Sequence, residues 1–328
     1  MKDKQKEGIS KKPLGIIYRW LGDRIFFTLA LALGLTIIVL SVSMAWVLSN
    51  ESSLAFKEFG VGGFLTGTTW DPGVGLKFGA LPFILGTMVT SVAALAIAFL
   101  PAIAIGIFIA EYAPKWIGSI IDNLIHLIAA IPSVVVGIWG IFAFAPWMRE
   151  SVYIPVFNWT ANNWPSLLPV LGNPMGYGIA TATIILALMI IPFTTVLTRD
   201  AISKVPREQR EAAWALGATR WEVIRMAVLP YARGGILAGV MLSFGRAIGE
   251  TMAVAMLIGN KNTLPFTIIG PAATMPSVII NEFREAVGSL HVSSLMGIGL
   301  VLFVISLTVN LIAAYITRKL SATGGQLV

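Results

Sequence analysis

Arg246 and Glu250 are oppositely charged residues, four positions apart, inside an apolar stretch that runs from Gly235 to Gly259. Holding an Arg at the centre of a bilayer costs roughly 2.5 to 3.5 kcal/mol on insertion scales, so a charge kept there predicts an ion or substrate pathway. Arg presents a planar fork of donors that suits oxyanions such as phosphate, and it stays charged at any accessible pH. The pair therefore predicts a path for an anion.

Three other residues are expected to take part in this path. Glu250 lies one helical turn from Arg246 and can pair with it, which would keep the Arg from holding an anion too tightly. Thr251 adds a hydroxyl next to the pair. Ser133 follows a Pro that frees backbone groups, and it is a second candidate for lining the path.

A structural clamp is the alternative role for the charged pair. Arg246 and Glu250 could pair with each other, or with a partner permease, and make no contact with cargo, because charges within a membrane generally face a bundle interior. Gly245 and Gly249 are expected to let a neighbouring helix approach closely. The residues alone leave both roles open.

The composition indicates a membrane protein. Of 328 residues, 56% are hydrophobic and only 12% are charged, whereas soluble domains carry about 25% charged residues. Strand-like alternation is absent, so the predicted fold class is all-α. A helix needs about 20 apolar residues to cross a bilayer. Six segments meet that length: 25–48, 81–110, 117–145, 177–198, 235–259 and 292–317. The predicted organisation is a basic N-terminal segment, 1–24, followed by one permease domain, 25–328, whose first span is a retained anchor.

Lys and Arg are concentrated on one side of the predicted membrane. That side carries Lys2, Lys4, Lys6, Lys11, Lys12, Arg19, Arg24, Lys115, Arg199, Lys204, Arg207, Arg210, Arg220, Arg225, Arg233, Arg318 and Lys319. The other side carries Lys57, Lys77, Arg149, Lys261 and Arg284. The positive-inside rule then predicts cytoplasmic termini and a cytoplasmic connection over 199–234, with outer connections over 49–80, 146–176 and 260–291. Nucleic-acid binding is not expected, because the charges are spread over loops without a recognised module.

The connection over 199–234 contains the most specific pattern in the chain. Its residues are Glu211, Ala212, Ala213, Gly217, Leu229 and Pro230. A helix is predicted from Pro206, with Gly217 ending or turning it and a second helix over about 220–228. Two short helices with a small Ala face make a compact knob that can insert into a groove on another protein. The alternative is an amphipathic connection lying on anionic membrane lipid.

This pattern resembles the cytoplasmic coupling loop of ABC importer permeases, which docks on an ATP-hydrolysing subunit. Ala227 stands where that family usually has Ile. Three further strings, Phe78–Phe83, Ile131–Gly140 and Gly245–Thr251, resemble the permease subunits of phosphate importers. Trp70–Pro72, ahead of the first of these strings, favours the PstC type over the related PstA type.

The resemblance implies a six-helix permease of the type I ABC importer fold in the cytoplasmic (inner) membrane of a prokaryote, moving inorganic phosphate. It implies four kinds of component: this chain, a second permease of the PstA type, ATPase subunits of the PstB type, and an external phosphate-binding protein of the PstS type. ATP and Mg²⁺ would bind to the ATPase, and this chain would bind no cofactor.

No catalytic site is predicted in this chain. The sequence lacks the Gly-x4-Gly-Lys-Ser/Thr phosphate loop and any metal-spaced cluster, so ATP hydrolysis is expected on a partner. A permease for sulfate or molybdate, or a secondary anion transporter, is the alternative function, although no paired repeat supports the latter. Asp122 and His126 are expected to form an interfacial hydrogen-bonding pair rather than a proton relay, and Glu111 and Lys115 only to flank a short turn.

Overall fold

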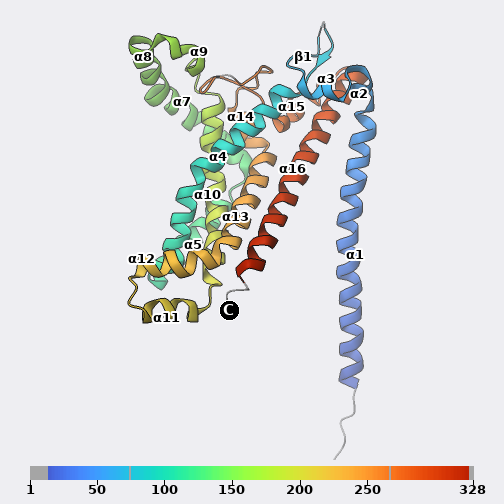
Figure 1. Ribbon diagram of the computed structural model, residues 1–328. Coiled ribbons are helices and arrows are strands. Elements are labelled where there is room, and N and C mark those ends of the chain that lie inside the picture. Colours follow the sequence, from blue (N-terminus) through green and yellow to red (C-terminus); the bar gives the residue numbers. More distant parts are fainter. Residues whose placement is uncertain (1–13, 74, 266, 325–328) are drawn as a thin grey trace, which may run out of the picture. The chain divides into compact units, whose positions relative to one another are not determined.

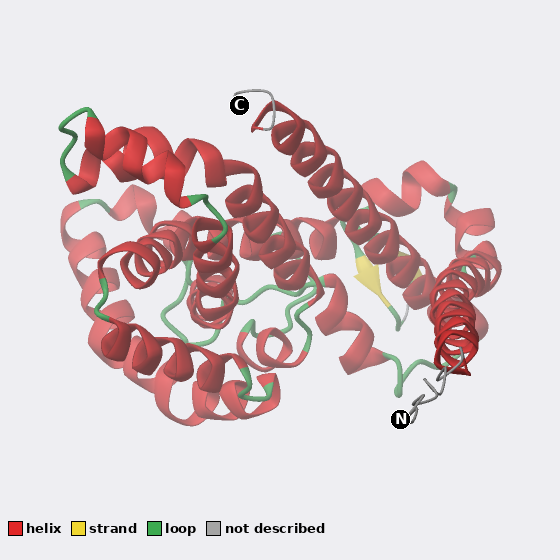
Figure 2. Ribbon diagram, turned by 90° about the horizontal axis from the view of Figure 1, so that it is seen from below, coloured by secondary structure: helices red, strands yellow, loops and turns green. Residues whose placement is uncertain are grey.

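The computed structural model describes residues 14–73, 75–265 and 267–324, which are almost wholly helical (Figures 1 and 2). The chain divides into two compact units, 1–50 and 51–328. The first unit consists of α1 (Leu14–Glu51), up to residue 50. The basic segment predicted over 1–24 falls partly on residues 1–13, outside the described residues, and its remainder belongs to α1.

The predicted all-α membrane fold is confirmed. Among the described residues, five helices are long and apolar enough to cross a membrane, and a bent pair of helices brings the number to six. The five are Arg24–Glu51, Leu81–Tyr112, Ile179–Ser203, Arg220–Gly249 and Ser289–Lys319. They overlap five of the six predicted spans, and four of them match the predicted bounds to within a few residues. The second of them comprises α4 (Leu81–Ile107) and a π-helical turn, η1 (Phe108–Tyr112).

The third predicted span, 117–145, is bent in the structure instead of continuous. It consists of α5 (Lys115–Ala129) and, after a break, α6 (Ser133–Trp139), and the two parts of the bent pair meet at 86°. Pro132 lies in the break with an extended backbone, ψ 136°. Proline lacks a backbone N–H and disfavours helical geometry at the residue before it, which explains why the helix stops here.

The helix after α6 continues toward the segment predicted as an outer connection. It passes through η2 (Gly140–Phe144), α7 (Ala145–Met148), η3 (Arg149–Tyr153) and α8 (Ile154–Asn163). A short turn, η4 (Pro165–Leu167), and α9 (Leu168–Leu171) follow. Figure 1 shows α7, α8 and α9 together at one end of the second unit.

The fifth predicted span, 235–259, is displaced and broken. Helical backbone begins earlier, in α12 (Arg220–Val223) and η5 (Ile224–Val228), and runs on into α13 (Leu229–Gly249). After Glu250 and Thr251 the chain resumes as α14 (Met252–Leu257). Pro230 falls in the first turn of α13, where its missing N–H costs little.

The centre of the second unit is α10 (Ile179–Ser203), which packs against α4, α13, α14 and α5. Small residues allow this packing, since a Cβ on Gly106 would lie 2.8 Å from Thr198 Cγ2. The buried Thr194 hydroxyl donates to Ser243 Oγ at 2.7 Å and thereby links α10 to α13. These contacts hold α13, which carries Arg246, against the core.

The outer connections fold into short elements of their own. The connection before α4 forms α2 (Ser53–Phe59), α3 (Val61–Thr66) and a two-stranded antiparallel sheet of β1 (Trp70–Asp71) and β2 (Lys77–Phe78). The last connection contains α15 (Met275–Glu282) and leads into α16 (Ser289–Gly324).

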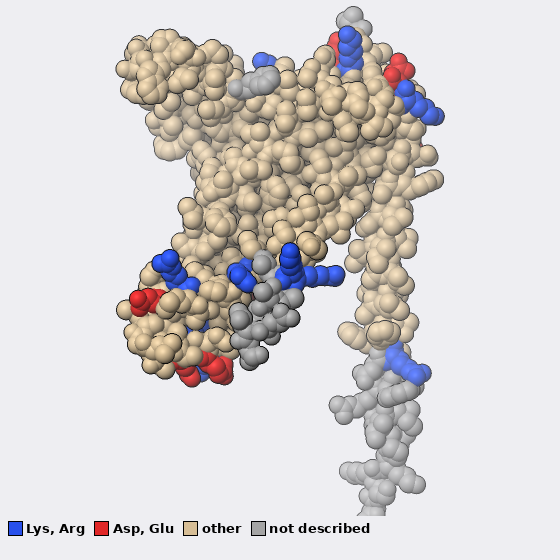
Figure 3. Space-filling model, viewed as in Figure 1, with Lys and Arg blue, Asp and Glu red and all other residues tan. Residues whose placement is uncertain are grey.

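The two ends of the second unit differ in what they carry. One end, the β1 end, holds β1, α8, α9 and α15, and the opposite end, the α11 end, holds α11 (Arg207–Ala215) and α12 (Figure 1). On the face shown in Figure 3, Lys, Arg, Asp and Glu gather near these two ends, and the wide zone between them is free of charged colour. This banding is the pattern expected of a body that crosses a membrane.

Candidate functional site

Arg246 lies in the last turn of α13 and lines a cavity of about 350 Å³. The lining residues come from α5, the break after it, α6, α10 and α13: Ile128, Ala129, Ile131, Val135, Val136, Trp139, Leu188, Met189 and Arg246. Arg246 is the charged member of this otherwise apolar set. Its guanidinium carbon lies 5.5 Å from the centre of the Phe193 ring, within the range of a cation–π contact. Apolar walls beside a cation strengthen its attraction for an anion wherever they keep water away from the charge.

Arg246 and Glu250 both lie within the described residues, and the expected ion pair between them is not among the ion pairs of that part of the chain. The expectation assumed a helix continuing through both residues. Instead α13 ends at Gly249, and Glu250 adopts an extended backbone, φ −67° and ψ 122°, which takes it off the helical face. Arg246 is exposed in this single chain and Glu250 is partly buried. The charge of Arg246 is therefore available to a ligand or to a partner.

The two hydroxyl residues predicted for the path lie at the two helix breaks. Ser133 begins α6, two residues before the lining residue Val135, and it is partly buried. The Thr251 hydroxyl donates to the Gly249 carbonyl at 3.1 Å, across the break between α13 and α14. The short helices after the two breaks, α6 and α14, pack on each other. They are so close that a Cβ on Gly137 in α6 would lie 3.2 Å from Ala253 Cα in α14.

The two glycines near Arg246 differ. A Cβ on Gly245 would lie 3.1 Å from Asn310 Oδ1 on α16, so Gly245 permits the close approach that the sequence predicts. A Cβ on Gly249 would meet nothing within 4 Å in this chain, so the same prediction for Gly249 is not met here. Gly249 is the last residue of α13, so it need not contact the helix that packs against Gly245 one turn earlier.

The two short helices and the Gly corner predicted over 206–228 are present at the α11 end and are called the coupling knob below, after the role expected from the sequence. Gly217 ends the first helix with a left-handed backbone, φ +80°, and its N–H donates to the Trp214 carbonyl at 2.9 Å. Thr219 and Glu222 form a capping box that starts α12. Leu229 begins α13 directly after η5, so the knob leads into the membrane helix without a separate loop.

The surface of the knob is open, and apolar side chains are exposed on it beside the charged residues of α11. Glu211 and Ala212 are exposed, and Ala213 is partly buried. The large side chains around them are exposed as well, with Leu216 at 89%. A groove of about 540 Å³ runs between the two helices of the knob and is lined by Ala212, Ala213, Leu216, Gly217, Ala218, Glu222, Met226 and Ala227. Such a face suits a protein partner.

One connection of the knob is not predicted by the sequence. Glu111, expected only to flank a turn, accepts hydrogen bonds from Arg210 Nε at 3.1 Å and Nη2 at 2.7 Å. Arg220 donates to the Glu111 backbone carbonyl, and its guanidinium lies 4.8 Å from the centre of the Tyr112 ring. Both helices of the knob are thus fixed to η1, at the end of the second span. The sequence around Glu111 contains no pattern that predicts its pairing with Arg210, which lies 99 residues later.

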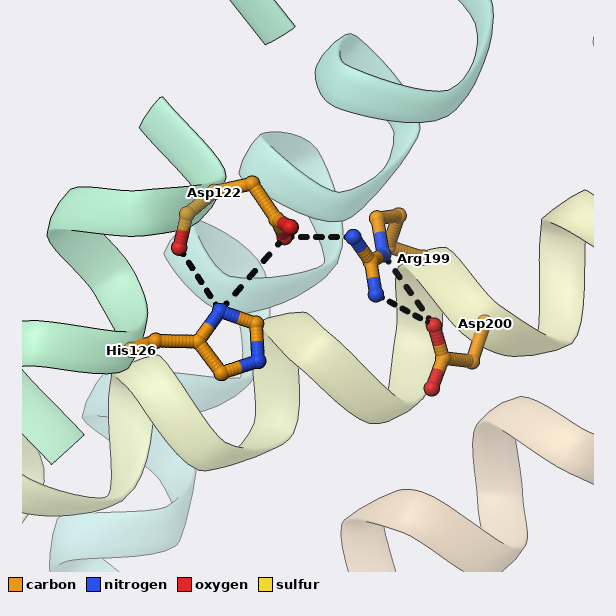
Figure 4. Close-up of polar contacts among 4 residues, drawn as sticks. All are labelled: Asp122, His126, Arg199 and Asp200. Atoms are coloured by element: carbon orange, nitrogen blue, oxygen red, sulfur yellow. Dashed lines mark hydrogen bonds and ion pairs between the residues drawn. The ribbon is translucent and has the colours of Figure 1, made fainter. Parts of the chain in front are cut away.

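Asp122 and His126 belong to a second polar cluster, between α5 and α10 (Figure 4). His126 Nδ1 lies 2.8 Å from the Asp122 carbonyl oxygen, which agrees with the predicted pair. Asp122 Oδ1 also lies 2.5 Å from Arg199 Nη1, and Arg199 donates to Asp200 Oδ1 from Nε and Nη2. The cluster therefore joins two membrane helices, which the spacing of Asp122 and His126 alone does not reveal.

Comparison with solved structures identifies the fold. A bacterial ABC transporter involved in the import of the acidic polysaccharide alginate contains a chain with the same fold, with a TM-score of 0.59 and 18% identity. The match covers 92% of this chain and 99% of that chain. The fold is therefore that of an ABC importer permease.

Residues 102–322 match the family described as the binding-protein-dependent transport system inner membrane component. The chain belongs to this family. Two similar relatives, both named phosphate transport system permease protein PstC, come from Mesorhizobium japonicum and Haemophilus influenzae. Each is 42% identical, over 93% and 91% of this chain and 93% of the relative in both cases.

Membership of the family places this chain in the inner membrane as a multi-pass component of a binding-protein-dependent transporter. The matched range, 102–322, includes the Arg246 cavity and the coupling knob. The family description implies an ATPase and a binding protein as partners of such a component.

Proposed function

We propose that this chain is the permease subunit of an ATP-driven importer that carries inorganic phosphate across the cytoplasmic membrane. The observation that supports this most is Arg246, a fixed cation on the wall of an otherwise apolar cavity between α5, α6, α10 and α13. A guanidinium matches the oxygen fork of phosphate and gives up its own hydration more readily than an ammonium does. The phosphate permeases that resemble this chain over most of its length support the choice of anion.

Arg246 would attract the anion, and the residues at the two helix breaks would complete its path. Glu250, Thr251 and Ser133 lie where α13 and α5 stop, and non-helical backbone at membrane depth is tolerated where it lines a cavity. Glu250 carries a negative charge close to the cavity without neutralising Arg246, so it would favour release of the anion after it has passed.

The coupling knob would transmit the work of ATP hydrolysis. Glu211, Ala212, Ala213 and Gly217 form its docking helix and corner, and Leu229 and Pro230 begin the membrane helix that carries Arg246. Because helical backbone is continuous from Arg220 to Gly249, a displacement of the knob would move the Arg246 end of that helix as one body. The contacts of Glu111 would move the end of α4 with it.

The complete transporter would contain a second permease of the PstA type, two ATPase subunits of the PstB type and an external binding protein of the PstS type. ATP and Mg²⁺ would bind to the ATPase, and this chain would hold no cofactor. The coupling knob and both termini would then lie in the cytoplasm, and the β1 end would face the outside.

Uptake of radiolabelled phosphate and sulfate into proteoliposomes that contain the whole complex tests this function. Phosphate is expected to enter only with hydrolysable ATP, and sulfate is expected to enter at the background rate. Uptake of sulfate but not phosphate would show a permease for another oxyanion. Phosphate uptake that continues without ATP and follows an ion gradient would show a secondary transporter.

A further inference from the structure

A second cavity, of about 850 Å³, lies at the β1 end, where the three outer connections meet (Figure 1). Its walls come from the loop between α3 and β1, from α9 with the loop after it, and from the loop that follows α14. Among the described residues of its lining, Lys261 alone carries a formal charge. Four further lining residues are able to donate hydrogen bonds: Thr68, Asn173, Thr263 and Thr267. The lining contains no carboxylate, so the cavity favours an anion.

The backbone that carries Lys261 is held firmly. Its N–H donates to the Ala272 carbonyl at 3.1 Å, and Ala272 in turn donates to the Ile258 carbonyl at 2.9 Å. Asn260, before it, has a left-handed backbone, φ +48°, and its amide donates to the Ala255 carbonyl at the end of α14. Asn262, after it, donates to Glu282 Oε1 at 2.7 Å.

Glu282 links two of the outer connections and α16 around this loop. Its other carboxylate oxygen accepts a hydrogen bond from Trp70 Nε1 at 2.7 Å and lies 3.0 Å from Nε2 of the buried His291. Trp70 belongs to β1, Glu282 to α15 and His291 to α16. The position of Lys261 is therefore set by elements from two outer connections and a membrane helix.

The part of the lining that comes from α9 and from residues 267–270 is also ordered. Ile268 and Ile269 donate to the carbonyls of Val170 and Leu171, at 3.0 Å each, and so join the loop after α14 to α9. The side chain of Thr267 fits against two glycines of the lining, because a Cβ on Gly270 would lie 2.1 Å from its hydroxyl oxygen and one on Gly172 would lie 2.8 Å from its Cβ. This threonine is thus held in place beside the cavity.

We propose that the Lys261 cavity is an external receiving site for a hydrated oxyanion of the phosphate class. This inference rests on the proposed function. The cavity is large enough to admit the anion with bound water, and an ammonium is itself strongly hydrated, so binding here is loose. The smaller and apolar Arg246 cavity requires the anion to lose that water. The anion therefore meets the weakly binding, polar Lys261 cavity first and the mostly apolar Arg246 cavity later. Weak binding at the first site lets the anion enter the path without being trapped there.

The absence of cysteine from the whole chain permits a direct test in the assembled transporter. A single Thr263→Cys substitution puts a thiol on the cavity wall and leaves Lys261 intact. The rate at which a neutral thiol reagent modifies it, with and without inorganic phosphate, measures occupancy. We expect a slowing of about tenfold when phosphate is roughly ten times its Kd for the site. Thr66→Cys, on an exposed residue outside the lining, is the matched control and is expected to show no slowing.

Lys261 is tested by repeating the measurement in Thr263→Cys/Lys261→Gln and Thr263→Cys/Lys261→Arg. Protection is expected to vanish with Gln and to persist with Arg, while Thr263→Cys/Lys77→Gln, which removes another exposed lysine of the same end, behaves like Thr263→Cys. Equal protection with and without Lys261, or none in any variant, overturns the proposal. If Lys261→Gln instead weakens docking of the external binding protein and phosphate gives no protection, the cavity is a protein-docking surface.

The failure of this inference differs from the failure of the proposed function. A complex that takes up phosphate but shows no phosphate protection at Thr263→Cys rejects only the receiving site. A complex that takes up no phosphate at all rejects the transport function itself.

Discussion

Arg210 in α11 donates two hydrogen bonds to a single carboxylate oxygen of Glu111, a residue of η1. Only 15% of the Arg210 side chain and 10% of the Glu111 side chain are exposed. Arg210 also donates to the Ile202 carbonyl at 3.0 Å, at the end of α10. One side chain of the coupling knob thus contacts the ends of two membrane spans, and we expect a movement of the knob to move both.

Replacing Glu111 by Gln is expected to separate ATP hydrolysis from transport. The substitution leaves the Arg210 charge partly buried without its partner, a change that costs about 3 to 5 kcal/mol for a fully buried pair and less for this partly exposed one. Transport per ATP hydrolysed, measured in proteoliposomes, should fall severalfold while the ATPase subunits stay bound. Glu208→Gln removes an exposed acid from the first turn of α11, the helix that carries Arg210. This control variant should behave as the parent.

The charge-reversed pair Glu111→Arg/Arg210→Glu distinguishes this ion pair from a general loss of packing. Partial recovery of coupling relative to either single reversal is expected, since the two charges can meet again. Additive losses in the double variant would show that the pair itself does not transmit the movement.

Gly217 is expected to tolerate other residues poorly because of its backbone. An L-residue with φ near +80° costs about 1 to 2 kcal/mol, although a Cβ there would meet no atom within 4 Å. Gly217→Ala should therefore weaken retention of the ATPase on the purified complex, and Gly217→Asn should weaken it less. Gly62→Ala, at an equally open position without a positive φ, should leave retention unchanged. Equal retention in all three variants would show that the corner is not needed.

Gly86 is expected to be intolerant for a steric reason. A Cβ at this position of α4 would lie 2.1 Å from the Ala273 carbonyl oxygen, so α4 and the loop before α15 would have to separate. Overpacking of this kind costs about 1 to 3 kcal/mol, and Gly86→Ala should lower the thermal unfolding temperature of the complex. Gly63→Ala, with nothing within 4 Å of the added Cβ, is the matched control. An unchanged unfolding temperature for Gly86→Ala would show that the contact relaxes freely.

Replacing Arg246 by Gln is expected to abolish phosphate uptake while the complex still assembles. Arg246→Lys should restore uptake only in part, because an ammonium keeps the charge but not the planar fork of donors. Uptake is measured alongside the stoichiometry of the purified complex. A complex that falls apart on Arg246→Gln would support the structural clamp instead.

Much of the fold follows from the sequence because long apolar runs leave few choices. The second, fourth and sixth spans coincide with helices, since each run is bounded by charged or Gly-rich residues. The bend at Pro132 and the break at Glu250 are less predictable. Proline is tolerated inside other helices of this chain, such as Pro101 in α4 and Pro192 in α10, so its presence does not by itself decide where a helix stops.

The candidate site is predictable in its residues but not in its contacts. Arg246 stands out because a buried charge is costly, and the corner at Gly217 stands out because of its spacing. The ion pair of Arg246 with Glu250, both described residues, is not formed in the structure. The prediction assumed a helix that continues through both residues, whereas α13 ends at Gly249. Glu111 and Arg199 are missed for another reason: their partners lie far along the chain, and no local pattern encodes such a pairing.

The role of Arg246 in binding the anion is best tested by the structure of the assembled transporter, determined with phosphate bound and the membrane path closed on both sides. We expect phosphate to lie against Arg246, with the guanidinium donating to its oxygens and residues of α6 and α10 around it. Phosphate found elsewhere, with Arg246 paired to a carboxylate of the second permease, would contradict it.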